Sequence, residues 1–308
     1  MRLFKKTNID FLGKRKMWYV VSTAMVLVGM ISVVFKGINY GIDFQGGTEI
    51  VLAFQQKVEI SDIRTALAKA GLGISEIKYY GTDNYILINT GEQAEGTIIA
   101  DRIKNAVQIS MADKKFEVVK EDKVGPKIGQ ELRRDALLAV IWSFVAIMIY
   151  IALRFKFAYG FGAVVALVHD IFTTFGFLSI LNGLLPGLNL DISQEVIAAF
   201  LTLIGVSVND TVIIFDRIRE NEKIYRSMPL EGVMNKSIND TLSRTVITVG
   251  TIFIVLFVLL FFGGEVNRPF AFTMLFGLVT GTYSSVFVAS AFTLDWTLYR
   301  NRKKAVTA

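Results

Sequence analysis

Residues 194–221 have the sequence QEVIAAFLTLIGVSVNDTVIIFDRIREN, and residues 237–251 have the sequence SINDTLSRTVITVGT. The first stretch is apolar over the length of a membrane-spanning helix, and it carries Asn209 and Asp210 within it. The second begins in a charged segment and turns apolar after Arg244. Ionisable side chains inside a membrane span are costly and usually face a bundle interior or a water path. The pattern predicts a polytopic α-helical membrane protein with a titratable pair on consecutive spans.

The composition supports a membrane protein. The chain is 53% hydrophobic and 19% charged, whereas soluble domains are typically about 45–50% apolar and about 25% charged. It has no cysteine, which excludes disulfides and thiolate metal sites, and its one histidine cannot form a multi-histidine metal site. We therefore expect neither a metal nor an organic cofactor.

Six apolar segments are long enough to span a membrane. The predicted transmembrane helices are residues 17–35, 136–153, 157–181, 194–215, 245–262 and 269–294. The first follows a basic start, as in a secretory signal peptide, but it exceeds the usual signal core of about 7–15 residues and no A-x-A cleavage pattern follows. We expect it to be retained as a transmembrane helix.

The distribution of basic residues predicts the orientation. The proposed cytoplasmic segments are residues 1–16, the turn 154–156, residues 216–244 and residues 295–308, with six, two, six and four Lys or Arg. The two short turns on the other side hold one, Arg268. This bias follows the positive-inside rule and places both termini in the cytoplasm. The net charge of +6 thus reflects membrane orientation and does not indicate nucleic-acid binding.

Residues 37–134 form a different kind of segment, with mixed polar and apolar patterning. Strand-like runs cover 47–54, 74–80, 85–89 and 116–119, and amphipathic helices cover 61–70 and about 94–111, with Ser61 as a candidate N-cap. The order strand, helix, strand, strand, helix, strand predicts a small α+β ferredoxin-like domain outside the cytoplasm.

Asp210 and Arg244 are the main candidate site residues. Asp210 lies within its span but nearer the cytoplasmic end, where a buried carboxylate could bind and release a proton, and Asn209 beside it could donate to a carboxylate. The alternative is an acid that hydrogen-bonds to neighbouring helices and only specifies packing. Arg244 begins the next span, where an arginine can also extend to the head groups.

Further polar and small residues lie in the other spans. His169 and Asp170 lie in the middle of the third span, as candidates for proton transfer or for structural hydrogen bonds, and we expect Asp170 to join Thr173 and Thr174 in a polar network. Gly277 and Gly281 have the small-xxx-small spacing of closely packed helices, although the same stripe could line a hydrated path. Gly46 and Gly47 predict a hinge where the α+β segment begins. We find no nucleotide-binding loop or hydrolytic triad in the sequence and therefore expect no enzyme activity.

Several motifs resemble those of the SecD/SecF family, and within it the SecF half. They are GIDFQGGT at 41–48, VGPKIGQEL at 124–132, LVHD at 167–170, VNDTVIIFDRIREN at 208–221 and SRTVIT at 243–248. The resemblance covers nearly the whole chain. It implies a resistance-nodulation-division type membrane fold of six helices, which is half of a twelve-helix unit that SecD completes.

The resemblance also implies a function. Members of the family act in bacterial protein export at the inner membrane, where proton flow assists late steps after the SecA motor and the SecYEG channel have acted; YajC and YidC belong to the wider complex. The translocating polypeptide would be the substrate and protons the coupling ion. Asp210 and Arg244 match the residues implicated in proton conduction in the family. The alternatives from other functional classes are a small-molecule or lipid exporter of the same superfamily and a passive assembly scaffold.

Overall fold

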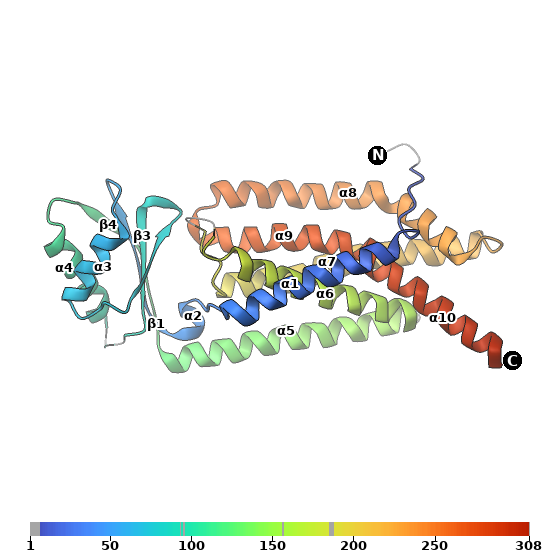
Figure 1. The fold of residues 1–308 in the computed structure, drawn as a ribbon, viewed down its shortest axis with the longest axis horizontal. Coiled ribbons are helices and arrows are strands. Elements are labelled where there is room, and N and C mark those ends of the chain that lie inside the picture. Colours follow the sequence, from blue (N-terminus) through green and yellow to red (C-terminus); the bar gives the residue numbers. More distant parts are fainter. Residues whose placement is uncertain (1–6, 93, 95, 156, 185–187, 308) are drawn as a thin grey trace. The chain divides into compact units, whose positions relative to one another are not determined.

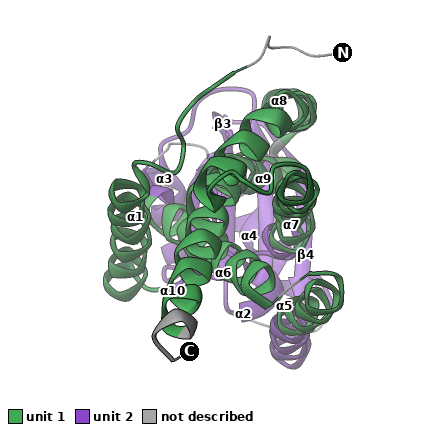
Figure 2. Ribbon diagram, turned by 90° about the vertical axis from the view of Figure 1, so that its right-hand side faces the viewer, with its two compact units in different colours: residues 1–37, 139–180, 198–308 green, residues 38–138, 181–197 purple. Residues whose placement is uncertain are grey.

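The computed structural model describes residues 7–92, 94, 96–155, 157–184 and 188–307. The basic residues Arg2, Lys5, Lys6 and Lys156 lie outside these ranges. The chain forms two compact units (Figures 1 and 2). We call residues 1–37, 139–180 and 198–308 the membrane unit, and residues 38–138 with 181–197 the α+β unit.

In the described residues, six helical segments are long and apolar enough to cross a membrane. They are α1 (Arg15–Lys36), α5 (Pro126–Arg154), α6 (Phe157–Leu181), α7 (Gln194–Ile224), α8 (Leu230–Phe262) and a composite segment Arg268–Lys303. The composite segment contains α9 (Arg268–Ser284), η2 (Ser285–Ser290) and most of α10 (Ala291–Thr307). The prediction of a polytopic helical protein is thereby confirmed.

The six segments divide into inner and outer helices by burial. In their apolar windows, 44% of α6, 50% of α7 and 67% of the composite segment are buried, against 11% of α1, 6% of α5 and 11% of α8. Two outer helices therefore expose large apolar side chains, such as Trp142 and Leu153 on α5 and Phe262 on α8. Lipid tails or further membrane helices must cover these faces.

The α+β unit contains one four-stranded sheet and two packed helices. Its elements are α2 (Ile42–Gln45), β1 (Gly47–Phe54), α3 (Ile60–Lys69), β2 (Glu76–Tyr80), β3 (Thr82–Thr90), α4 (Ile98–Ser110) and β4 (Phe116–Val124). The strand order is β2-β3-β1-β4 and every pair is antiparallel. Figure 1 shows α3 and α4 together on one face of the sheet. This topology confirms the predicted ferredoxin-like fold.

Apolar residues at every second position of the strands, and at helical spacing on α3 and α4, form the core of this unit. Alternate residues of β1 and β3, namely Ile50, Leu52, Ile86 and Ile88, point to the helix-covered face and are fully buried. The apolar faces of α3 and α4 close this core with Ile63, Leu67, Ile103 and Val107. Burial of these side chains on both layers accounts for the stability of a small domain without disulfides.

The structure differs from the sequence predictions in local detail. Helix α3 begins at Ile60 after Glu59, which makes no side-chain cap, so the Ser61 N-cap is wrong. The polar segment 216–244, expected to be a loop between two spans, is mostly helical, because α7 extends to Ile224 and α8 starts at Leu230. The charged residues of this segment lie on helices that continue beyond the apolar, membrane-spanning stretches. Hydropathy predicts only the apolar stretch of a helix and therefore misses such extensions.

Gly46 and Gly47 occupy backbone conformations that favour glycine. Their φ angles are 74° and 140°. Both are buried, and a Cβ on Gly47 would lie 2.3 Å from the Thr90 carbonyl oxygen, while one on Gly46 would lie 3.0 Å from Pro126 Cα. The pair is thus required where β1 meets β3 and the start of α5. A hinge at this point stays a prediction.

Residues 181–197, which connect α6 to α7, belong to the α+β unit. A parallel bridge pairs Tyr40 with Ile192, with Ile192 N donating to Asn39 O at 2.8 Å and Gly41 N donating to Ile192 O at 2.9 Å. The α+β unit therefore contains the first turn of α7 as well as the segment after α1.

Candidate functional site

The interior of the membrane unit contains a buried carboxylate at the meeting point of three helices. Asp170 on α6 is 1% exposed. Its Oδ2 accepts hydrogen bonds from Ser207 on α7 at 2.6 Å and from Ser284 on α9 at 2.8 Å. Burying a carboxylate is costly unless its lone pairs are satisfied, and the two hydroxyls meet part of this need from two different helices.

His169 completes this cluster. Its Nδ1 lies 3.1 Å from Asp170 Oδ1, and its Nε2 lies 3.4 Å from the Thr173 hydroxyl. The sequence predicts a polar network of Asp170 with Thr173 and Thr174, and Thr173 joins it through His169, whereas Thr174 pairs with a different residue. Thr173 contacts His169, and the Thr174 hydroxyl lies 3.3 Å from that of Thr280 on α9. Neighbouring side chains point about 100° apart on a helix, but a ring next to a carboxylate is long enough to reach it.

A π-helical segment lies beside the carboxylate. The segment η2 begins at Ser285, one residue after Ser284, and Ser290 Oγ donates to Ser285 O at 2.9 Å across five residues. The Ser285 hydroxyl lies 2.9 Å from that of Thr211 on α7. Short π segments inside membrane helices frequently occur at functional sites. At its start, the consecutive residues Ser284 and Ser285 contact two different partners, Asp170 on α6 and Thr211 on α7.

Gly277 and Gly281 bring α9 close to α7. A Cβ on Gly277 would lie 2.4 Å from Leu203 Cδ2, and one on Gly281 would lie 3.1 Å from Ser207 Oγ. This close packing agrees with the small-xxx-small prediction. It also brings Ser284, one turn further along α9, within reach of Asp170.

Asp210 lies one turn beyond Ser207 on α7 and is 3% exposed. Within the described residues its carboxylate makes no hydrogen bond, although Arg244 is close enough to attract it electrostatically. The pairing of Asn221 with Ser237 (2.9 Å) fixes how α7 and α8 are aligned at their charged ends. Asp210 lies eleven residues before Asn221 on α7, and Thr248 lies eleven residues after Ser237 on α8. In two antiparallel helices this places Asp210 level with Thr248, which is one turn beyond Arg244.

Asn209 and Arg244 are both exposed in the single chain. Asn209 shares one face of α7 with Thr202 and Gly205, which are also exposed, at the spacing of one helix side. Asp210 points away from that face into the unit. Ser207 therefore links Asp170 to the turn of α7 that carries Asp210, while Asn209 points to the surface of the unit.

The charged ends of α7 and α8 form a separate network. Arg217 Nη2 lies 2.8 Å from Asp240 Oδ2, and Arg154 Nη2 lies 3.0 Å from Asp216 Oδ1. Arg15 on α1 pairs with Asp295 on α10 at 2.9 Å. Arg217 is thus engaged in an ion pair at the end of the span, apart from the Asp210 site.

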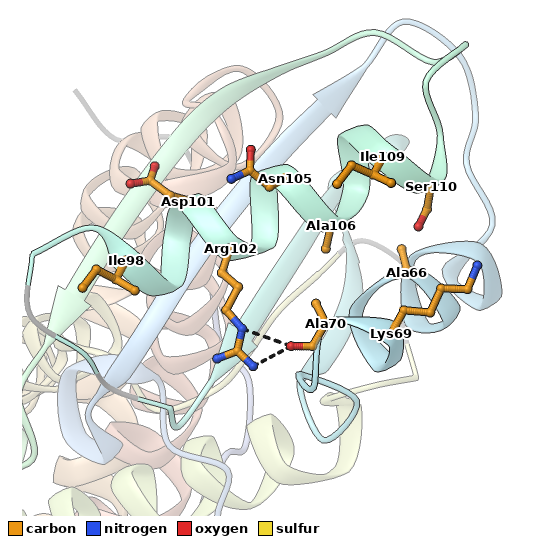
Figure 3. Close-up of a pocket in the computed structure, with 10 residues that line it drawn as sticks. All are labelled: Ala66, Lys69, Ala70, Ile98, Asp101, Arg102, Asn105, Ala106, Ile109 and Ser110. Atoms are coloured by element: carbon orange, nitrogen blue, oxygen red, sulfur yellow. Dashed lines mark hydrogen bonds between the residues drawn. The ribbon is translucent and has the colours of Figure 1, made fainter.

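The α+β unit has a groove of about 650 Å³ between α3 and α4 (Figure 3). Arg102 from α4 crosses its floor and donates from Nε to Ala70 O at 3.0 Å, and Ile98 and Ile109 are exposed along its side. Its titratable lining residues, Lys69, Asp101 and Arg102, are all exposed, so the buried carboxylates of the membrane unit are the better candidate site.

Two protein-family descriptions match the chain. "SecD/SecF GG Motif" covers residues 31–58, and "Protein export membrane protein SecD/SecF, C-terminal" covers residues 103–299. The chain belongs to the SecD/SecF family. The GG motif contains Gly46 and Gly47, and the longer match contains Asp170, Ser207, Asp210 and Ser284.

Individual relatives agree with this assignment. The protein translocase subunit SecF of Rhodothermus marinus is 41% identical over 96% of this chain and 95% of its own length. That of Thermodesulfovibrio yellowstonii is 41% identical over 94% of this chain and 95% of its own length. The chain is therefore similar to SecF proteins along almost their whole length.

Solved structures of SecDF proteins share the fold. The crystal structure of SecDF from Thermus thermophilus, a translocon-associated membrane protein, superposes with a TM-score of 0.84 and 34% identity over 94% of this chain. A second SecDF structure, in a super-membrane-facing form, superposes with a TM-score of 0.71. The chain spans only 39% and 41% of those two longer chains.

Sequence reasoning missed Ser207, Thr211 and Ser285 as members of the site. Single serines and threonines are common in membrane helices, and one chain offers no signal that marks the ones that point at a carboxylate. The sequence offers one signal, the spacing of Ser207 and Asp210. Ser207 lies three residues before Asp210, so the two side chains are neighbours on the helix surface.

Proposed function

We propose that this chain is a membrane subunit of the Sec protein translocase in which proton binding at Asp210 assists the export of polypeptides. The observation that carries the proposal is the pair of buried carboxylates, Asp170 and Asp210, which the Ser207 turn of α7 separates. Intramembrane acids that face a bundle interior typically mark ion or proton pathways. The names of the SecF relatives support the translocase role.

The two carboxylates have different environments and, in this proposal, different roles. Asp170 already accepts hydrogen bonds from two hydroxyls and contacts His169, so it holds α6, α7 and α9 together. Asp210 makes no hydrogen bond among the described residues, so a proton or a water can occupy its lone pairs. A change in the charge of Asp210 then alters the attraction to Arg244 and the packing of α7 against α8.

A second set of membrane helices would cover the polar face of α7. Thr202, Gly205 and Asn209 are exposed on that face, and an amide exposed to lipid tails is costly. We propose SecD as the occupant, because the SecDF structures contain a chain more than twice as long as this one. SecYEG, YajC, YidC and SecA form the proposed wider complex, in the bacterial inner membrane with both termini cytoplasmic.

Export of a reporter protein by an Asp210→Asn chain tests the proton role. We expect export to fall and to lose its dependence on the proton gradient, because an amide cannot titrate. Asp216→Asn on the same helix is the control, since Asp216 is partly exposed and pairs with Arg154 at the charged end of α7. Export by Asp210→Asn at the unmodified rate, still dependent on the gradient, would overturn the proposal.

Cross-linking tests the partner. The chain has no cysteine, so a single Asn209→Cys gives one reactive position in the proposed contact face. We expect it to cross-link to SecD, whereas Ile149→Cys on the exposed side of α5 serves as a lipid-facing comparison. An exporter or an isolated scaffold would purify without SecD and the channel.

A further inference from the structure

The α+β unit holds the N-terminal end of α7 through three separate contacts. The first is the backbone pairing between residues 39–41 and Ile192, with N–O distances of 2.8 Å and 2.9 Å. It forms a short two-stranded element immediately before α7. Because the α6–α7 connection belongs to this unit, the contact makes it part of the domain.

The second contact is a largely buried ion pair. Asp191 is 7% exposed, and its Oδ2 lies 2.9 Å from Lys78 Nζ on β2. Its Oδ1 accepts a hydrogen bond from Asn182 Nδ2 at 2.9 Å. Desolvation on its own lowers the pKa of Lys78, but Asp191 and Glu76 together raise it above its usual value. Removal of one partner from such a pair leaves an uncompensated charge, which is strongly destabilising.

The third contact is at the helix terminus itself. Gln194 is the first residue of α7, and its backbone N–H donates to Asp43 Oδ2 at 3.1 Å. The first N–H groups of a helix have no partner within it, and a carboxylate there also meets the positive end of the helix dipole. Asp43 lies on α2, and α2 ends at Gln45, immediately before Gly46 and Gly47.

From this end, α7 continues without interruption to Ile224 and carries Ser207 and Asp210. Asp210 is sixteen residues after Gln194, which is about 24 Å along an α-helix. The domain thus holds one end of the same continuous helix that contains the candidate proton site.

We propose that Asp43, Lys78 and Asp191 are positioning residues that attach the outer end of α7 to the α+β domain, so that α7 itself transmits movement between the Asp210 site and that domain. We call this set of contacts the α7 clamp. The inference rests on the proposed function of Asp210. The proposal makes α7 the mechanical link between the Asp210 site and the α+β domain. In sequence, by contrast, the helices that directly precede and follow the domain are α1 and α5.

An engineered disulfide can replace the clamp. A Cβ built on Gly41 lies 3.4 Å from Ser193 Cβ, close to the separation of about 3.5–4.5 Å found in disulfides. Gly41 has φ −66°, so a side chain is tolerated there. Gly73 and Ala68 offer a matched control pair near α3, with the same 3.4 Å between the Cβ positions but no connection to α7.

The experiment uses the full chain together with SecD in cells. Asp43→Ala/Lys78→Met disrupts the clamp, and we expect export to fall to the level of Asp210→Asn. Carbodiimide labelling of Asp210 should remain as in the unmodified chain, because the proton site is intact; a collapsed fold would change both measurements. Adding Gly41→Cys/Ser193→Cys should restore export under oxidising conditions and lose the effect on reduction, whereas Gly73→Cys/Ala68→Cys should not restore it.

Normal export by the disrupted chain, or failure of the Gly41→Cys/Ser193→Cys disulfide to restore export, overturns the clamp. The parallel Asp210→Asn chain separates this result from the proposed function. If Asp210→Asn exports normally while clamp disruption and rescue behave as expected, the proton role fails and the attachment of α7 remains. Limited proteolysis of the α+β domain in each variant identifies any chain that has unfolded, and such a chain counts against the clamp unless the disulfide rescues it.

Discussion

The Ser207 hydroxyl donates a 2.6 Å hydrogen bond to the Asp170 carboxylate and thereby joins α7 to α6 one turn before Asp210. Ser284 binds the same carboxylate oxygen from α9 at 2.8 Å. One buried acid therefore fixes the relative position of three inner helices. A displacement of α7 at Asp210 would strain the Ser207 contact, so the polar cluster around Asp170 is directly linked to the proposed proton site.

Ser207→Ala should destabilise the membrane unit. It removes a donor to a buried carboxylate without a large change in volume, and we expect a loss of about 1–2 kcal/mol. Thr202→Ala on the same helix is the control, because Thr202 is exposed and donates to its own Ala198 carbonyl. Denaturant unfolding of the full chain in detergent micelles measures both. Equal losses for the two variants would show that the Ser207–Asp170 contact is not specifically stabilising.

Gly277→Ala should also destabilise the unit, for a steric reason. The added Cβ would lie 2.4 Å from Leu203 Cδ2, and overpacking in a close helix contact typically costs about 1–3 kcal/mol. Gly250→Ala on α8 is the matched case, since nothing lies within 4 Å of its Cβ position. There the gain in helix propensity should stabilise by about 0.5–1 kcal/mol. Opposite signs in the same unfolding assay are the expected result, and equal signs would contradict the packing role.

Gly47→Ala should weaken the α+β unit more than Gly91→Ala. Gly47 has φ 140°, and a Cβ there would lie 2.3 Å from Thr90 O, whereas Gly91 has open space around its Cβ position. The clash falls between β1 and β3, so it should increase hydrogen exchange at the amides that join these strands. Faster exchange confined to β1 and β3 in the Gly47 variant supports this interpretation, and unchanged exchange would exclude it.

The fold was predictable because its signals are repetitive. Six long apolar runs identify membrane helices, and alternation around Ile50 and Leu52 identifies a strand whose core side faces a helix layer. The ends of the elements were less predictable. Helices α7 and α8 continue into charged sequence, where ion pairs such as Arg217–Asp240 stabilise them, and a hydropathy window cannot detect a contact between distant residues.

The candidate site was predictable only in part. Asp170 and Asp210 are recognisable because a carboxylate in an apolar run is rare. Their partners are not, because Ser207 and Ser284 become neighbours only after α6, α7 and α9 pack. The attachment of residues 181–197 to the α+β unit was also invisible in the sequence, since Asp191 and Lys78 lie 113 residues apart and neither is unusual in a polar segment.

Glu49 and Asp101 should give opposite pH dependences to the stability of the α+β unit. Burial of Glu49, which outweighs the attraction of Lys120, raises the pKa of this carboxyl above its usual 4.5. The folded state therefore binds a proton more readily than the unfolded state, and the contribution of Glu49 to the unfolding free energy falls as the pH rises above about 4.5. Hydrogen bonds from Lys104 and Thr97 lower the pKa of Asp101 below 3.8, so its contribution is lost as the pH falls.

Glu49→Gln and Asp101→Asn test this difference in the full chain. Local unfolding free energies come from hydrogen exchange at the amides of β1, corrected for intrinsic exchange, between about pH 2 and about pH 7, a range that includes the pKa values of both carboxyls. The unmodified chain loses stability as the pH rises because the buried Glu49 gives up its proton. The Glu49→Gln chain has no such proton to lose, so its stability relative to the unmodified chain should increase with pH. Asp101→Asn should lose stability over the same range. Parallel slopes for the two variants would mean that burial does not control the protonation of Glu49.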